Sequence, residues 1–297
     1  MKDDILEKYR EAGKIAAKAR EHGKTFIKNS AAYTKVVEET EKKIMELGGK
    51  PAFPVNLSVN EVGAHDTADI KDGRVLDEGL VKLDVGVHID GYIGDTATTI
   101  SLDSGKEDMI MAVEEALDKA MKRMVPGERI KNISAEIEKT IKEFGYRPIR
   151  NLTGHGLGKY DLHAKMSFPN VKTDIDYKLK EGDVFALEPF ATDGAGKVKD
   201  SSKALIYKYN KDAPVRSRDG RKILNMAKEE FKKLPFAKRW LEKQVSPLKL
   251  NIALRQLVGR NALREYHVLK EGDNGAVSQA EHTVIVGEKP EITTELD

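Results

Sequence analysis

Cysteine is absent from the 297 residues of this sequence. The absence excludes a disulfide framework, a zinc site built from thiolates and a cysteine nucleophile. An excess of charge of one sign is also missing, because 51 Lys and Arg nearly balance 49 Asp and Glu and leave a formal net charge of +2. The overall charge therefore does not indicate a nucleic-acid or membrane partner. Any chemistry must use oxygen and nitrogen groups.

Long apolar runs are missing too. No stretch approaches the roughly 18 consecutive apolar residues of a membrane helix. The first thirty residues open with Met1-Lys2-Asp3-Asp4 and lead into an amphipathic helix, so we expect no signal peptide and a cytoplasmic protein. Hydrophobic residues make up 39% of the chain, enough for a core, and the length fits one large domain or two ordinary ones.

The clearest β-hairpin in the chain turns at Asp90-Gly91, a strong two-residue turn signal. Its predicted strands are Val81–Ile89 and Tyr92–Ile100. This turn pairs Asp84 with Ala97 and places Asp95 on the same face, diagonally from Asp84 and about 7–8 Å away at the backbone. At an effective dielectric of 20, two carboxylates 4 Å apart repel by roughly 4 kcal/mol, which a bound cation would relieve. The alternative is a pair of surface aspartates near a turn.

Three later motifs carry further candidate ligands. His155 lies among glycines in Asn151–Gly158, which leaves room for a metal ion or a substrate. Glu188 ends a strand that looks buried, where an unpaired charge is costly. Glu281 begins an apolar strand. Taken singly, each residue also fits a structural histidine or a charge at a strand end.

Together these positions form one chemically coherent set: Asp84, Asp95, His155, Glu188 and Glu281. Four carboxylates and one imidazole supply hard, oxygen-rich coordination, and two divalent cations balance four negative charges. Such a set suits cobalt, manganese, iron(II), zinc or nickel. Because paired metal ions activate a water molecule and polarise a carbonyl, the sequence predicts a hydrolase with two divalent metal ions.

The order of these motifs resembles the methionine aminopeptidases of the pita-bread fold, over essentially the whole chain. The matching segments are Phe53–Ser58, Lys82–Gly86, Gly91–Ala97, Gly154–Leu157, Leu162-His163, Glu188–Ala191 and Glu281–Thr283. The resemblance implies an α+β fold, with a pseudo-twofold antiparallel sheet covered by helices. The helical segment between Glu188 and Glu281 is similar to the type II subfamily in its archaeal form.

The resemblance also implies a division of the chain. We expect a pita-bread catalytic domain over residues 1–193 and 265–297, and a winged-helix-like insert subdomain over about 194–264. Between Arg216 and Arg264 the sequence has fourteen Lys and Arg against four acids, about +10, and Pro235 and Pro247 break this part into three short helices. Two interpretations stay open: a solvated surface that keeps the protein soluble, or a docking face for the ribosome.

Roles for the ligands follow from the resemblance alone. Asp84 would bind one metal ion, Asp95 and Glu281 would bridge both, and His155 and Glu188 would bind the second. Glu188 would also carry the proton of the attacking water.

The same resemblance assigns the substrate contacts. His163 would contact the scissile peptide group and stabilise the tetrahedral intermediate, and His65 would line the site and contact substrate. The apolar pocket for a methionine side chain would be formed by Phe53, Leu162, Phe190 and Tyr266.

The implied function is removal of the N-terminal methionine from nascent proteins and peptides, with a small second residue preferred, by a cytoplasmic monomer without a membrane partner. Two alternatives remain. A prolidase or aminopeptidase P shares the ligand order but usually adds an N-terminal domain, whereas only about 80 residues precede Asp84 here. A non-enzymatic relative that binds RNA or protein would lose ligands, and this chain keeps the full set.

Overall fold

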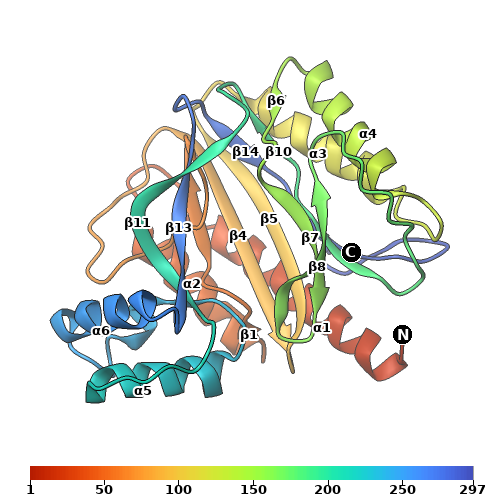
Figure 1. Ribbon diagram of the computed structural model, residues 1–297. Coiled ribbons are helices and arrows are strands. Elements are labelled where there is room, and N and C mark those ends of the chain that lie inside the picture. The colour runs from red at the N-terminus through yellow and green to blue at the C-terminus, as the bar shows by residue number, and fades with distance from the viewer. Residues whose placement is uncertain (297) are drawn as a thin grey trace.

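A computed structural model describes residues 1–296 and, of Lys165, only the backbone. Antiparallel strands form the centre of the molecule, and helices cover them (Figure 1). The helices are α1 (Asp3–Lys24), α2 (Tyr33–Glu46), α3 (Glu107–Met121), α4 (Ile130–Glu143), α5 (Arg218–Met226) and α6 (Pro247–Gly259). Within residues 1–296, no helix is both long and apolar enough to cross a membrane.

The first half of the molecule is built on the predicted hairpin. Its strands are β4 (Gly79–Ile89) and β5 (Tyr92–Leu102). The turn residues Asp90 and Gly91 have φ angles of 51° and 93°, as a type I′ turn requires. On its other edge β4 pairs with β1 (Lys50–Pro51) and β2 (Asn56–Val59). Apolar residues of α1, α2, β2 and β4 form one core cluster behind this sheet.

The second half repeats this plan with other elements. One sheet has the order β16 (Glu291–Ile292), β15 (His282–Ile285), β9 (Val184–Leu187), β7 (Thr153–Gly158), β8 (Asp161–Pro169). A small neighbouring sheet contains β14 (Val277–Gln279), β10 (Phe190–Thr192) and β6 (Arg147–Pro148). Helices α3 and α4 share a core cluster with these strands. Each half thus covers strands with a pair of helices.

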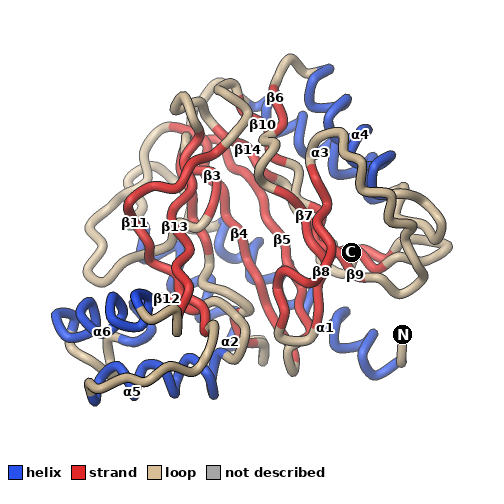
Figure 2. The backbone as a smooth tube through the Cα atoms, viewed as in Figure 1, coloured by secondary structure: helices blue, strands red, loops and turns tan. Residues whose placement is uncertain are grey.

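The two halves meet along β5, where an isolated bridge joins Ala97 to Glu281 and further hydrogen bonds join Asp95 to Thr283 and Thr99 to Gln279. The Glu281 N–H donates to the Ala97 carbonyl oxygen at 3.0 Å, and the Ala97 N–H donates to the Glu281 carbonyl oxygen at 3.3 Å. Because this bridge joins residues 184 positions apart, it brings the hairpin and the segment between β14 and β15 together. The hairpin strands β4 and β5 lie at the middle of the molecule (Figure 2).

The helical insert lies at one end of a fourth sheet (Figure 1). The sheet has the order β12 (Phe236–Ala237), β11 (Val198–Tyr209), β13 (Leu263–Glu271), β3 (Val62–Ala64). The expected insert boundary at residue 194 therefore includes β11, which belongs to a sheet that also contains β3. Helices α5 and α6 and strand β12 share a core cluster with the ends of β11 and β13, and this cluster includes Ile223, Phe236 and Leu257.

The insert also differs from the three expected short helices. A π-helical segment (Ala227–Phe231) extends α5, and only a 3₁₀ turn (Lys238–Leu241) stands between β12 and α6. Pro247 begins α6 instead of breaking a helix, since the first helical position needs no N–H donor.

Candidate metal centre

The hairpin carboxylates share one face of the sheet. Asp84 pairs with Ala97, as the turn predicts, and Ala97 pairs with Glu281 on its other side. Residues directly opposite one another on adjacent strands project to the same face, so Asp84 and Glu281 flank Ala97 in one row. Asp95 lies two residues from Ala97 along β5 and shares that face.

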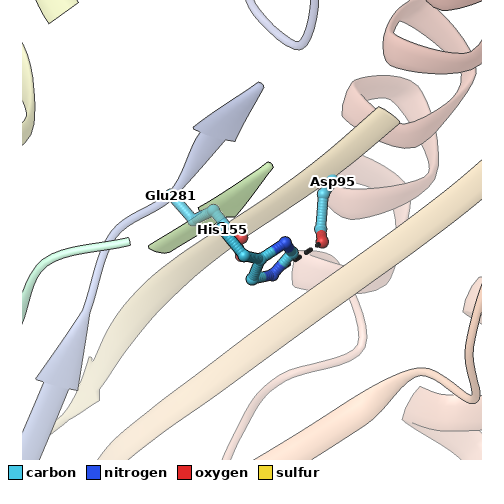
Figure 3. A group of neighbouring side chains, drawn as sticks. All are labelled: Asp95, His155 and Glu281. Atoms are coloured by element: carbon cyan, nitrogen blue, oxygen red, sulfur yellow. Dashed lines mark ion pairs between the residues drawn. The ribbon is translucent and has the colours of Figure 1, made fainter. Parts of the chain in front are cut away.

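His155 and Glu188 approach the same point from the second half. His155 of β7 pairs with Ala186 of β9, and Glu188 follows two residues later. The Nε2 atom of His155 lies 3.5 Å from Oε1 of Glu188 and 3.8 Å from Oδ2 of Asp95. Asp95, His155 and Glu281 present ligand atoms that all lie within 4.8 Å of one another (Figure 3). All five predicted ligands therefore converge.

This cluster is buried and carries charge of one sign. Only 2% of Asp95, 2% of Glu281 and 7% of His155 is exposed. Burial, and then the neighbouring carboxylates, raise the pKa of Asp95, Glu188 and Glu281 well above the usual range. Burial alone raises the pKa of Asp84 and lowers the pKa of His155 to about 4.

Several polar atoms of the cluster also lack protein partners. Among the described residues, Oδ1 of Asp84, Oδ1 of Asp95 and Nδ1 of His155 are buried without a hydrogen bond. Buried carboxylates are normally paired or coordinate a metal ion, because an isolated buried charge is very costly. The donor set, oxygen-rich with one imidazole, fits a divalent metal ion. The cluster thus has the character of a metal site.

The glycines beside His155 serve the strands and not a ligand. A Cβ atom on Gly154 would lie 2.5 Å from the carbonyl oxygen of Ala186, and one on Gly156 would lie 3.2 Å from that of Ala164. They let β7 fit closely between β9 and β8. The neighbouring strands therefore fill the space that side chains at these two positions would need.

A cavity of about 240 Å³ opens over the cluster. Five of the six predicted substrate-contacting residues line it: Phe53, His65, Leu162, His163 and Tyr266. The sixth, Phe190, does not line it. Its side chain is buried in a core cluster with Ile149, Val198 and Val277, behind the cavity wall.

His65, His163 and Tyr266 form an aromatic rim above the carboxylates. The His163 ring lies 4.5 Å from the His155 ring, and the Tyr266 ring lies 5.2 Å from His65 and 6.3 Å from His163, between centroids. His65 has a φ angle of 64°, which is unusual for a residue with a side chain. Its Nδ1 atom lies 3.2 Å from the His267 carbonyl oxygen, so Nδ1 carries the proton and Nε2 is the acceptor.

Other cavity-lining residues were not among the predicted site residues. They include Asn56, Asn151, Thr153, Ile206 and Pro235. Asn56 could have been found by strand alternation, because it is a polar residue two positions from Ser58 in an otherwise apolar strand. Pro235 comes from the insert, and nothing local in the sequence places it beside the hairpin.

Comparison with known proteins identifies the family. The model of "Metallopeptidase family M24" matches residues 7–230. This chain belongs to metallopeptidase family M24. A methionine aminopeptidase of Pyrococcus abyssi is 47% identical over 291 residues, covering 97% of this chain and 99% of that relative. The predicted resemblance to archaeal methionine aminopeptidases is confirmed.

Solved structures of other proteins have the same fold as this chain. The structure of a thermophilic Arx1 has a TM-score of 0.87 at 18% identity, covering all of this chain and 92% of that chain. A methionine aminopeptidase from Thermotoga maritima has a TM-score of 0.72 at 23% identity, covering 100% and 98%. The predicted pita-bread fold is confirmed.

Proposed function

We propose that this chain removes the N-terminal methionine from nascent proteins and peptides by metal-dependent hydrolysis. The observation that carries the proposal is the convergence of four carboxylates and His155 at the base of a small cavity with apolar and aromatic walls. Relatives named methionine aminopeptidase, 42–47% identical over nearly the whole chain, support it. The proposed setting is the cytoplasm, with the enzyme acting as a monomer.

Two divalent ions, drawn from cobalt, manganese, iron(II), zinc and nickel, would be held by Asp84, Asp95, His155, Glu188 and Glu281. Asp95 and Glu281 would serve both ions, Asp84 would hold one, and His155 and Glu188 would hold the other. When bound, such ions activate a water molecule and polarise the scissile carbonyl.

Residues of the chain itself would transfer the protons and stabilise the negative charge that develops on the carbonyl oxygen. Glu188 would accept a proton from the attacking water and pass it to the departing amine. His163, whose ring lies beside that of His155, would donate a hydrogen bond to the carbonyl oxygen as negative charge builds on it. His65 would contact the substrate backbone from the rim.

Substrate choice would follow from the cavity walls. Phe53, Leu162 and Tyr266 offer apolar and aromatic surfaces, which suit a thioether side chain. A cavity of about 240 Å³ is below the usual range for ligand pockets, so it favours a small residue after the methionine. Because such a pocket discriminates one methylene by only about 1–3 kcal/mol, norleucine should be tolerated.

The test is turnover of Met-Ala-Ser and of Xaa-Pro peptides by chelator-stripped protein that receives one metal at a time. We expect Met-Ala-Ser to be cleaved after its first residue, and only with metal. If Xaa-Pro peptides without methionine were the best substrates, the prolidase alternative would replace this proposal. If no peptide were cleaved with any metal, the non-enzymatic alternative would.

A second proposal concerns the basic insert, which we suggest as a docking face for the ribosome. Most of its cations point to solvent, and exposed examples are Lys233, Lys243, Lys249 and Arg260. Two others are already used inside the protein: Arg239 is buried against Glu41, and Lys238 lies 3.1 Å from Asp69. Contacts between exposed cations and RNA phosphates would weaken steeply with salt.

The experiment is cosedimentation with ribosomes over a salt series. We compare the natural protein with a variant in which Lys233, Lys243, Lys249 and Arg260 become glutamate. We expect the variant to lose binding at low salt while cleaving Met-Ala-Ser at an unchanged rate. Equal binding by both proteins, or no binding by either at low salt, would leave the insert as a solvated surface.

A further inference from the structure

Asp95 of the first half is bonded to the second half by the hydroxyl group of Thr283. The Asp95 N–H donates to Oγ1 of Thr283 at 2.8 Å, and that hydroxyl donates to the Asp95 carbonyl oxygen at 2.9 Å. Both residues are buried. One threonine side chain therefore satisfies both backbone polar groups of a predicted metal ligand.

The register of the hairpin explains why the backbone of Asp95 needs a partner outside β4. In an antiparallel pair, bonded and non-bonded residue pairs alternate along the strands. Ile89 and Tyr92 flank the two-residue turn as a bonded pair, so Gly86 and Asp95, three residues farther along each strand, form a non-bonded pair. The N–H and carbonyl oxygen of Asp95 hence point away from β4 and toward β15.

The backbone of Thr283 is not available to β5. Two residues before it, Glu281 exchanges both backbone hydrogen bonds with Ala97, and the next such pair would involve Thr283. Instead, the Thr283 N–H donates to Oγ1 of Thr294, and the Thr283 carbonyl oxygen accepts the N–H of Thr293, each at 3.0 Å. Strand β15 thus changes its neighbour at this residue, and the hydroxyl of Thr283 bonds β5 in place of its backbone.

This arrangement makes the two ligands that would serve both metal ions unequal. Glu281 is fixed to β5 by backbone bonds, which no substitution of a side chain removes directly. Asp95 is fixed to β15 by a side chain, which a substitution can remove. Because Oδ2 of Asp95 lies 3.8 Å from Nε2 of His155 in the second half, a shift of the Asp95 backbone changes the distance between these two ligands.

We infer that Thr283 is a positioning residue of the metal centre, whose hydroxyl holds Asp95 at the distance from His155 and Glu281 that a bound metal ion requires. The inference rests on the proposed metal-dependent function and adds a residue outside the five ligands. Partners that orient a metal ligand typically contribute 10- to 100-fold to metal affinity. The same loss is therefore expected when the hydroxyl is removed.

The test measures the affinity of the metal-free protein for Mn²⁺ by competition with a fluorescent chelator, so the readout does not depend on turnover. Thr283→Val keeps the shape of the side chain and removes the hydroxyl, and the dissociation constant should rise about 10- to 100-fold. Thr283→Ser keeps the hydroxyl and should restore most of the affinity. If Thr283→Val does not fold, Thr283→Cys, whose thiol is only a weak donor and acceptor, takes its place with the same expected direction.

The matched control is Thr67→Val. Thr67 is also fully buried, and its hydroxyl donates to the Val55 carbonyl oxygen at 2.7 Å, but it bonds none of the five predicted ligands. Thermal stability without metal should fall in both valine variants, whereas Mn²⁺ affinity should fall only in Thr283→Val. Unchanged affinity in Thr283→Val, or an equal loss in Thr67→Val, would overturn the inference. If the natural protein binds Mn²⁺ but cleaves no peptide, the proposed function fails while these affinities still decide the role of Thr283.

Discussion

The carboxylate cluster and the basic insert both concentrate charge, of opposite sign. They differ in whether the charged side chains are buried and whether they are paired. Asp95 and Glu281 are buried beside other acids, and within residues 1–296 neither forms an ion pair with a lysine or arginine. The insert's cations are mostly exposed, and its buried one, Arg239, is paired with Glu41. Like charges are buried together only where a bound ion or ligand of opposite charge offsets the free-energy cost. Exposed charges have little such cost, so they do not by themselves indicate a ligand.

The largest test of this contrast removes one buried charge at the cluster. Asp95→Asn and Glu281→Gln keep size and shape but take away a metal-binding oxygen, so each should lower Met-Ala-Ser turnover by at least about 10³-fold, equivalent to several kcal/mol of transition-state stabilisation. Circular dichroism should show an intact fold. Glu230→Gln, at an exposed position in the insert, is the matched control and should remain fully active. Full activity in either cluster variant would contradict the metal assignment.

The next test turns to the buried cation of the insert. Arg239 bonds Glu41 and donates to Oγ1 of Thr67 at 3.2 Å, while Nε1 of Trp240 donates to the other Glu41 oxygen at 3.0 Å. Arg239→Met leaves the buried Glu41 without its cation, so the free energy of unfolding should fall by about 3–5 kcal/mol. Urea denaturation measures it.

The control for Arg239 is the exposed Lys233. Lys233→Met should change the free energy of unfolding by no more than about 0.5 kcal/mol, as is usual for a surface site. If the two variants were equally stable, the contrast between buried and exposed cations of the insert would fail.

His163 tests which residues of the cavity belong to the metal site and which to the substrate. It lies beside His155 but is assigned to the scissile group, so His163→Ala should lower kcat by about 10²- to 10³-fold with metal content unchanged. Metal analysis of the purified variant accompanies the kinetics. A loss of metal in proportion to activity would make His163 a ligand.

The pH dependence of stability should also separate the two regions. Without metal, the raised pKa values of Asp95, Glu188 and Glu281 mean that the folded protein holds protons at pH values where the unfolded chain has already lost them. Stability should therefore fall as pH rises from 7 to 9, by about 1.4 kcal/mol per pH unit for each carboxylate that stays protonated. Burial lowers the pKa of Lys82 to about 7, so this lysine makes stability rise over the same pH range. It is one group against three carboxylates.

Thermal unfolding at pH 7, 8 and 9, with chelator and with added manganese, measures this slope. Metal should flatten it, because the carboxylates are then ionised in the folded state. The histidines with lowered pKa values, such as His155 and His65, do not contribute above pH 7, since they are neutral there in both states. A metal-free slope no steeper than the metal-bound slope would contradict the burial of these charges.

The smallest expected effect concerns the apolar wall. A Cβ atom on Gly86 would lie 2.1 Å from the Phe53 ring, so Gly86→Ala must push that ring toward the cavity. We expect KM for Met-Ala-Ser to rise about five- to tenfold, as for a change of one methylene in an apolar pocket. Gly73→Ala, where no heavy atom lies within 4 Å, is the control. An unchanged KM would show that Phe53 does not form the pocket.

The sequence by itself determined the local parts of the site. A two-residue turn fixes the register of a hairpin, so the pairing of Asp84 with Ala97 and the shared face of Asp95 followed from Asp90-Gly91 alone. The positions of Glu188 just after β9 and of Glu281 just before β15 also followed from local apolar patterns.

Tertiary structure alone decided what depends on pairing between distant segments. The Ala97–Glu281 bridge and the His155–Ala186 pair set which way the other ligands face, and a short strand such as the four-residue β9 does not encode its partner. The same reason explains why Phe190 was misplaced and Asn56 overlooked, since a buried strand residue faces either core or cavity according to its neighbours. Charge counting likewise treats Arg239 and Lys233 alike, because only packing separates a buried cation from an exposed one.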